Sequence, residues 1–273
     1  MKVLLNLIFS FCFFCIINGC CYGYIPRDIV IFGDSLSDIG NVDRYTNGAV
    51  WLEALAKKCK LPSLECSKLG GSNFAYGGAK SGENENEDIL DVGNQIRSYL
   101  SRHDGKADED ILYVIWVGGN DFLDKRNPLD LVGNIRLHIE ELAGAGAKKF
   151  LVPNLPSLTH APRGGELVQS IVNHLLKYLP SSFEAPLKAI VNRLLYVTMD
   201  LYNVKLKQML SHIEVIKGIR VYYLDTFDLF NKMFKNLESF GFKEKSELFY
   251  DALHPSAKAH EVIADAAYGV LGE

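Results

Sequence analysis

The chain has 273 residues, of which 48% are hydrophobic and 23% are charged, an ordinary composition for a globular protein. An α/β domain of this length can be single, and the sequence contains no internal repeat or low-complexity segment. The formal net charge is -4 at pH 7, without a run of like charges. This balance excludes nucleic acid as an expected partner, because binding a phosphate backbone calls for a basic surface.

The first residues have the layout of a secretory signal peptide. Lys2 is followed by a mostly apolar stretch over residues 3–17, and small residues follow near Gly19 and Gly23. The apolar stretch is shorter than the roughly 20 residues that span a bilayer. We therefore predict a leader over residues 1–23 and one mature domain over residues 24–273. An uncleaved N-terminal anchor is the alternative.

Residues 17–20 (Ile-Asn-Gly-Cys) also resemble the cleavage box of a bacterial lipoprotein, in which Cys20 would carry the lipid. The sequence thus predicts an exported protein that is secreted, periplasmic, or anchored by lipid to the outer membrane or cell surface. In the mature part, Cys59 and Cys66 either form a disulfide, as export permits, or remain two separate thiols. Two cysteines without a nearby histidine make a poor zinc site, so no metal is expected.

The mature part alternates strand-like with helix-like segments. Strand patterns cover residues 28–33, 111–117, 149–152 and 219–224, and helical spacing covers residues 49–59, 129–143 and 256–271. The run at 111–117 (ILYVIWV) is apolar throughout, as in a strand that is buried on both faces. Alternation of this kind favours a parallel sheet with helices on both faces. We predict a three-layer α/β/α domain with a mostly parallel central sheet, similar to the flavodoxin-like arrangement.

The segment over residues 166–216 is too long for a short crossover and is largely helical in pattern. Its first part carries one apolar stripe at three- and four-residue steps, made of Leu167, Val168, Ile171, Val172, Leu175, Leu176 and Leu179. A helix that faces the core is the expected explanation. The alternative is a lid or a surface that contacts lipid.

Two short motifs contain a nucleophile and a base. The motif GDSLSD (residues 33–38) directly follows the first predicted strand, where the ligand sites of parallel sheets gather. Its Ser35 hydroxyl is a weak nucleophile until a base removes the proton, and such a serine in isolation is usually a helix cap. The motif DALHP (residues 251–255) offers that base. His254 can take the proton while Asp251 holds the imidazole in the right tautomer.

Two further motifs offer hydrogen-bond donors. In NFAYGGA (residues 73–79), the paired glycines let a backbone N–H point at a ligand. This segment is not a phosphate loop, because no glycine directly precedes Lys80. In GGND (residues 118–121), the Asn120 amide at the end of a strand can donate to a developing oxyanion. Each segment, taken alone, would also serve as a plain turn.

The four motifs, in this order along the chain, resemble the GDSL esterases and lipases, also called SGNH hydrolases for the Ser, Gly, Asn and His of their four sequence blocks. The resemblance spans residues 29 to about 270, and segments 47–51 (NGAVW) and 153–156 (PNLP) resemble connecting motifs of the secreted, lipase-like branch. The long segment over residues 166–196 is less typical of the family. No G-x-S-x-G elbow occurs, which argues against the α/β-hydrolase fold.

The resemblance implies a role for each matching residue. Ser35 would be the nucleophile, and Asp251 and His254 would complete the catalytic triad. The backbone N–H groups of Ser35 and Gly78 and the side chain of Asn120 would form the oxyanion hole. Gly77 is the competing assignment for Gly78, because the motif offers two adjacent glycines. No metal or organic cofactor is implied.

The sequence therefore predicts an exported serine ester hydrolase that forms an acyl-enzyme on Ser35. The expected partner is a small-molecule or lipid ester, such as a lysophospholipid, met in transient contact with a membrane or lipid surface. Two alternatives stay open. The same acyl-enzyme could pass its acyl group to an alcohol such as a sterol, or the fold could serve as a non-catalytic binding protein.

Overall fold

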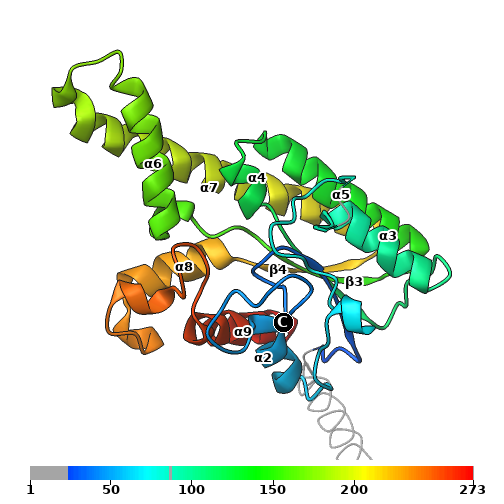
Figure 1. The fold of residues 1–273 in the computed structure, drawn as a ribbon. Helices are drawn as coiled ribbons and strands as arrows, with labels where there is room; N and C mark the ends of the chain where they lie inside the picture. The colour runs from blue at the N-terminus through cyan, green and yellow to red at the C-terminus, as the bar shows by residue number, and fades with distance from the viewer. Residues whose placement is uncertain (1–23, 86–87, 273) are drawn as a thin grey trace, which may run out of the picture.

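A computed structural model describes residues 24–85 and 88–272, so the predicted leader over residues 1–23 lies outside the described residues. Within them, four parallel strands form one sheet in chain order (Figure 1). They are β1 (Ile29–Gly33), β2 (Leu112–Trp116), β3 (Lys149–Pro153) and β4 (Arg220–Leu224). A single parallel bridge from Ile31 to Asn73 adds a short segment beyond β1. Because all strands run the same way, their carboxyl ends lie at one edge of the sheet.

Helices cover both faces of the sheet (Figure 1). One layer contains α2 (Trp51–Lys58) and α9 (Ala257–Leu271), which pack against each other. The opposite layer contains α3 (Val92–Arg102), α5 (Pro128–Ala145) and α7 (Glu184–Lys217). Two helices, α4 (Gly119–Leu123) and α8 (Thr226–Lys235), follow strands β2 and β4. The predicted three-layer α/β/α fold is thus confirmed.

Five short 3₁₀ helices are found among the described residues, all in the connections. They are Ser67–Leu69, Leu158–His160, Ser181–Phe183, Glu238–Phe240 and Lys245–Leu248.

The strand predictions are confirmed to within one or two residues at each end. Strands β1 and β2 are buried at every position, as their continuous apolar sequences required. Their register pairs Ile29 with Leu112 and Gly33 with Trp116. This pairing brings the segments that follow Gly33 and Trp116 to the same level of the carboxyl edge.

Helix α9 begins close to one of the predicted site motifs, and its start is capped. The Ser256 side chain accepts the N–H of Ala259 at 3.4 Å and donates to the backbone oxygen of Glu247 at 2.7 Å. A serine cap of this kind satisfies an N–H that has no partner within the helix. The cap therefore fixes the point at which the DALHP loop passes into α9.

Helices α6 (Pro162–Leu175) and α7 form a hairpin that projects from the rest of the molecule (Figure 1). The middle of the predicted apolar stripe faces α7. Val168 and Val172 are buried with Val191 in a small core that is separate from the main one. The prediction of a core-facing helix is therefore right for this part of the stripe, but the core belongs to the hairpin, and Leu179 is exposed. No helix among the described residues is long and apolar enough to cross a membrane.

The two cysteines of the mature part are both buried, and their thiols are separate. Cys59 follows α2, and Cys66 bridges to Asn73 beside the sheet. Of the two alternatives that the sequence leaves open, the structure has the unpaired thiols.

Candidate active site

The four sequence motifs meet at the carboxyl edge of the sheet. Ser35 follows β1, Asn120 lies in the first turn of α4 after β2, and His254 lies in the loop before α9. These three residues line one pocket. Gly78 and Asn120 line a second hollow beside it. The parallel sheet thus brings together residues that are up to 219 positions apart.

Ser35, His254 and Asp251 form a hydrogen-bonded chain. His254 Nε2 lies 2.8 Å from Ser35 Oγ, and His254 Nδ1 lies 2.7 Å from Asp251 Oδ2. The carboxylate accepts the Nδ1 proton, so Nε2 carries the lone pair that can take the serine proton. The three side chains therefore have the arrangement that activates a serine for attack on a carbonyl carbon.

The loop that contains Asp251 holds its carboxylate in place. The second carboxylate oxygen accepts the backbone N–H groups of Leu253 and His254, each at 2.7 Å. Burial raises the pKa of Asp251, but the hydrogen bonds from His254 and Leu253 outweigh it and hold that pKa below its ordinary value. Asp251 therefore stays ionised beside the imidazole over the neutral pH range.

Tyr45 packs on the imidazole, which the sequence motifs do not indicate. Its ring centroid lies 4.9 Å from that of His254, with 36° between the planes. A side chain added at Gly77 would overlap the Tyr45 ring, with its Cβ 2.1 Å from the hydroxyl oxygen. Tyr45 thus fills the space between the paired glycines and the histidine. Its role depends on a contact between segments 209 positions apart along the chain, so spacing could not reveal it.

A buried polar network joins the first and second motifs. Asn73 donates to the backbone oxygen of Ser37 at 2.7 Å. Asn41, which sequence reasoning missed, donates to the backbone oxygens of Asn73 and Ala75 at 2.8 and 2.9 Å. Each of these bonds satisfies a buried polar group, and together they fix the serine loop against the glycine loop.

The two adjacent glycines have different hydrogen bonds. The Gly77 N–H donates to Asp38 Oδ2 at 2.8 Å and is therefore occupied. Gly78 has a φ of +84°, which favours glycine, and its N–H donates to no acceptor among residues 24–85 and 88–272. Gly78 is thus the member of the pair whose N–H is available to a ligand.

Asn120 lines the same pocket as Ser35 and His254, and a hydrogen bond holds its side chain. Its amide nitrogen donates to the backbone oxygen of Ala79 at 2.9 Å, so one of its two hydrogens is used and one remains. The neighbouring Asp121 is buried and accepts both the N–H and the hydroxyl of Ser81, at 3.0 and 2.9 Å. These bonds fasten the GGND turn to the end of the glycine loop.

The pocket itself is small and mostly apolar, with a volume of about 60 Å³. Its apolar walls include Trp116, Leu155, Leu158, Met199, Phe230 and Phe249. None of the predicted stripe residues lines this pocket, but Leu167 lines the hollow beside it together with Gly78 and Asn120. Asp34 is the acidic member of the lining, and burial raises the pKa of Asp34 to about 7. Such walls suit the hydrocarbon part of a substrate.

The end of β3 is also fixed by an asparagine. Asn154, in the PNLP motif, donates to the Tyr223 hydroxyl at 2.7 Å and to Asp225 at 2.8 Å. Its own side-chain oxygen accepts the N–H of Phe227 at 2.9 Å. The motif therefore ties β3 to β4 and to the start of α8, beside the pocket wall.

Comparisons with known proteins show the family of the chain. A family model described as GDSL-like lipase/acylhydrolase matches residues 29–267. Lipase 1 of Photorhabdus luminescens is 34% identical over 197 residues, which cover 64% of this chain and 28% of that protein. The phosphatidylcholine-sterol acyltransferase of Aeromonas hydrophila is 28% identical over 172 residues, 55% of this chain and 51% of that protein. The chain thus matches about half or less of the length of these relatives.

A solved structure with a similar fold is that of protein YXIM from Bacillus subtilis. It has a TM-score of 0.50 and 16% sequence identity, and the match covers 90% of this chain and 56% of that one. At this identity the likeness concerns the fold. The family model covers nearly all of the described residues, and the Ser35–His254–Asp251 chain lies within its bounds. The chain therefore belongs to the family of GDSL-like lipases and acylhydrolases.

Proposed function

We propose that the protein is a serine ester hydrolase that forms an acyl-enzyme on Ser35. The observation that carries the proposal is the hydrogen-bonded chain from Ser35 Oγ through His254 to Asp251, at 2.8 and 2.7 Å. It lies at the mouth of an apolar pocket. A protein that only binds lipid would have no need for this alignment.

Each step of the reaction follows from these positions. His254 takes the proton of Ser35 as its oxygen attacks the ester carbonyl, and then gives that proton to the leaving alcohol. The oxyanion of the tetrahedral intermediate receives hydrogen bonds from the Ser35 and Gly78 N–H groups and the Asn120 amide. Water then attacks the acyl-enzyme, with His254 again as the base. Asp251 stabilises the imidazolium in both halves of the cycle.

For the substrate, we propose a lipid or lysophospholipid ester, met at a membrane or lipid surface. The support is the apolar lining of the pocket and the similarity to proteins named lipase and thermolabile hemolysin. A second candidate is acyl transfer to a sterol. It is favoured by the 28% identity to a phosphatidylcholine-sterol acyltransferase. Both reactions share the acyl-enzyme and differ only in whether water or an alcohol attacks it.

A panel of substrates tests the proposal. Short and long p-nitrophenyl esters, a phospholipid and a lysophospholipid are each incubated with the protein, with and without a sterol. We expect hydrolysis of the esters, and its loss in Ser35→Ala, which removes only a hydroxyl group. Formation of a sterol ester would favour transfer. Ester hydrolysis that survives in Ser35→Ala, or a serine-directed phosphonate that labels another residue, would contradict the assignment.

We further propose that the protein is exported and loses a leader over residues 1–23. The support is the sequence pattern of Lys2, the apolar stretch and the small residues that follow. Mass spectrometry of the natural protein distinguishes simple cleavage from lipidation at Cys20. A soluble cytoplasmic protein that keeps Met1 would contradict export.

A further inference from the structure

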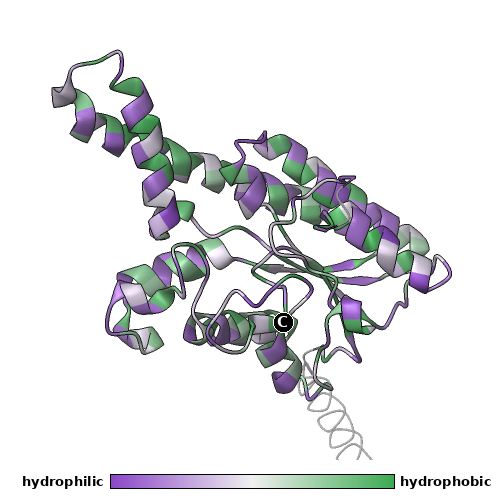
Figure 2. Ribbon diagram, viewed as in Figure 1, coloured by the Kyte–Doolittle hydropathy of each residue, from purple (hydrophilic) through white to green (hydrophobic). Residues whose placement is uncertain are grey.

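The outer face of α7 carries a row of exposed apolar side chains. The row consists of Ile190, Leu194, Val197, Leu201 and Val204, each between 43 and 61% exposed. The opposite face of the helix is buried against the body of the protein through Met199, Tyr202, Leu206, Leu210 and Ile213. Hydrophobic turns recur along both helices of the hairpin (Figure 2). The row therefore points away from the protein, and neither the main core nor α6 covers it.

The spacing of the row is that of a coiled-coil seam. Successive members are four, three, four and three residues apart, and half-buried Leu187 extends the row by one further step of three. This repeat of 3.5 residues keeps apolar side chains on one line of a helix that faces a second helix. A helix that packs only on its own protein needs one apolar face, and α7 already has one in its buried face. The exposed row is a second apolar face.

Five charged side chains flank the row. Arg193, Asp200 and Lys207, seven residues apart, lie on one side of the row, and Glu184 and Lys205 lie on the other. All five are exposed, and none forms an ion pair within residues 24–85 and 88–272. Arg193 lies over the Tyr196 ring and Lys207 over the Tyr223 ring of the same chain. Glu184 accepts only a weak bond from Gln169 at 3.3 Å, and Lys205 donates to Gln208 at 3.4 Å.

We propose that the row binds the same row of a second copy, with the two α7 helices antiparallel. A two-fold axis between Leu195 and Tyr196 then seats each apolar side chain against another. Leu194 faces Val197 of the second copy, and Ile190 faces Leu201. Val204 faces the exposed part of Leu187, whose other side packs against the small core of the hairpin. The symmetry repeats each contact, since an isologous interface uses the same patch on both copies.

The same alignment pairs four of the five flanking charges with the opposite sign, and the fifth, Lys207, lies over the Tyr223 ring of its own chain. Arg193 lies beside Asp200 of the second copy, and Glu184 lies beside Lys205, each twice across the axis. In antiparallel coiled coils, flanking positions of this kind meet in pairs and set orientation. A parallel pairing would instead place Arg193 beside uncharged Thr198. The mixed signs also make an anionic lipid surface a poorer match than a second copy, because such a surface attracts a uniformly basic face.

The helix is already formed and held by the body of the protein. Isolated helices of this kind must nucleate before they pair, which is unfavourable. Here residues 184–217 form one continuous helix whose inner face is buried in each copy. Association therefore gains the burial of the apolar row without that cost, and the active-site residues remain outside the interface.

The first test is the mass of the purified protein in solution, by sedimentation equilibrium. We expect a species with twice the mass of one chain at micromolar concentrations. Leu194→Asp and Leu201→Asp should each give a single-chain mass while hydrolysis of a water-soluble ester stays unchanged. Leu69→Asp, at an exposed position in a 3₁₀ helix away from α7, is the matched control and should keep the mass of two chains. A wild-type protein that stays monomeric at 100 micromolar overturns the proposal.

The second test exchanges the charges. Asp200→Arg places like charges together twice, so we expect the dissociation constant to rise about tenfold, and the same for Arg193→Asp. The double variant restores both pairs with reversed sign and should return the dissociation constant to near the wild-type value. Additive weakening in the double variant would overturn the antiparallel alignment.

The third test separates a second copy from a lipid surface. The protein is sedimented with phosphatidylglycerol vesicles and, in parallel, with phosphatidylcholine vesicles. We expect Leu194→Asp to abolish the double mass without changing the fraction bound to either vesicle. Vesicle binding by a monomeric protein that is lost in Leu194→Asp would assign the row to lipid and overturn the dimer.

Discussion

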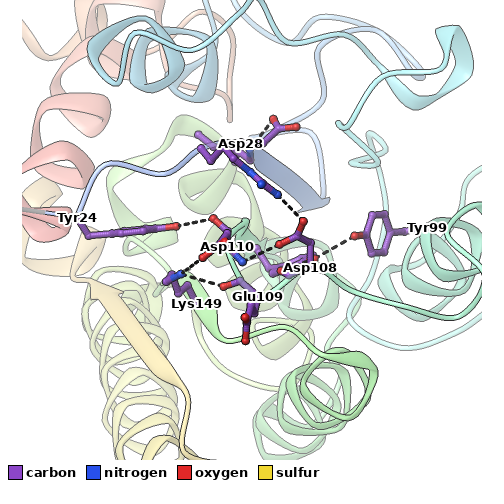
Figure 3. A network of polar contacts seen from close by, with 10 residues as sticks. Tyr24, Asp28, Tyr99, Asp108, Glu109, Asp110 and Lys149 are labelled. Atoms are coloured by element: carbon purple, nitrogen blue, oxygen red, sulfur yellow. Dashed lines mark hydrogen bonds and ion pairs between the residues drawn. The ribbon is translucent and has the colours of Figure 1, made fainter.

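Each of the two edges of the sheet carries a polar network. The network at the carboxyl edge is buried, whereas the network at the amino edge is partly exposed. At the carboxyl edge, Asn41 and Asn73 are buried, and their bonds hold the loops around Ser35. At the amino edge, the Tyr24 hydroxyl donates to the backbone oxygen of Asp110 at 3.2 Å, and Lys149 donates to that of Glu109 at 2.9 Å (Figure 3). Arg27 forms an ion pair with Asp108 there, with both side chains largely exposed.

The difference indicates what each edge does. Exposed ion pairs contribute little to stability, because water and salt screen them and ordering long side chains costs entropy. Removing one partner from a buried network lowers the stability of the protein far more, because the remaining polar group then has no partner and no water to bind. The ion pair at the amino edge thus adds little stability, whereas the buried network at the carboxyl edge fixes the loops around Ser35.

The largest effect should follow from a change of the carboxylate at the carboxyl edge. In Asp251→Asn, the amide oxygen can still accept the N–H groups of Leu253 and His254, so the loop keeps its shape. The amide nitrogen then faces Nδ1 and favours the wrong imidazole tautomer, and we expect kcat to fall by about 10⁴. Steady-state kinetics on a p-nitrophenyl ester measures this. The loss should persist at every pH between 6 and 9, and recovery at high pH would contradict a tautomer effect.

A smaller loss is expected from the oxyanion donor. Asn120→Ala removes an amide that matters only when charge develops on the carbonyl oxygen, so kcat should fall by about 10²–10³ with little change in KM. The neighbouring Asp121 supports the turn instead of the reaction. Asn120→Asp has nearly the same size but offers an acceptor, and it should be at least as inactive as Asn120→Ala. Full activity in Asn120→Ala would remove this residue from the oxyanion hole.

The sequence predicts the sheet well, because buried strands depend on local pattern, and its motifs single out side chains that the structure joins by hydrogen bonds. Apolar runs identify all four strands, and the motifs identify Ser35, Asn120 and His254. Helices α3 and α8 were not predicted. The first turns of α3 contain Gly93 and Asn94, which are weak helix formers, and its burial of Ile96 and Tyr99 reflects tertiary packing. Tyr45 and Asn41 were missed for a related reason, since their partners lie far away along the chain.

Stability at acid pH should depend on His260, a buried histidine in α9. His260 is almost fully buried and accepts the N–H of Trp51 at 3.2 Å, and burial lowers the pKa of His260 to about 3. In the unfolded chain the same group titrates near pH 6.5. The unfolded state therefore binds the proton first, and stability falls as the pH drops below about 6.5 and continues to fall towards pH 3.

We expect the free energy of unfolding to decrease by about 2 kcal/mol between pH 7 and pH 4.5 from this group. Urea denaturation at several pH values measures it. His260→Asn keeps an acceptor for the Trp51 N–H but cannot take up a proton, so its stability should depend less on pH in this range. Equal slopes for the wild type and the variant would show that other groups control the acid response.

The smallest effect is expected at the amino edge. The Asp110 N–H donates to Asp108, and this bond together with Arg27 holds the pKa of Asp108 below its ordinary value. The carboxylate therefore adds stability above about pH 4, where the unfolded group is also ionised, and that stability is lost as the pH falls through the lower folded pKa.

Because the Asp108 carboxylate is exposed, Asp108→Asn should lower Tm at pH 7 by less than about 2 °C. Ester hydrolysis should be unchanged, since Asp108 lies at the opposite edge of the sheet from Ser35. Differential scanning calorimetry in low and high salt provides the check, because the small difference should shrink further as salt screens the Arg27 pair. A loss of activity in Asp108→Asn would mean that the two edges of the sheet are coupled through the strands. The contrast between the exposed network at the amino edge and the buried network at the carboxyl edge would then fail.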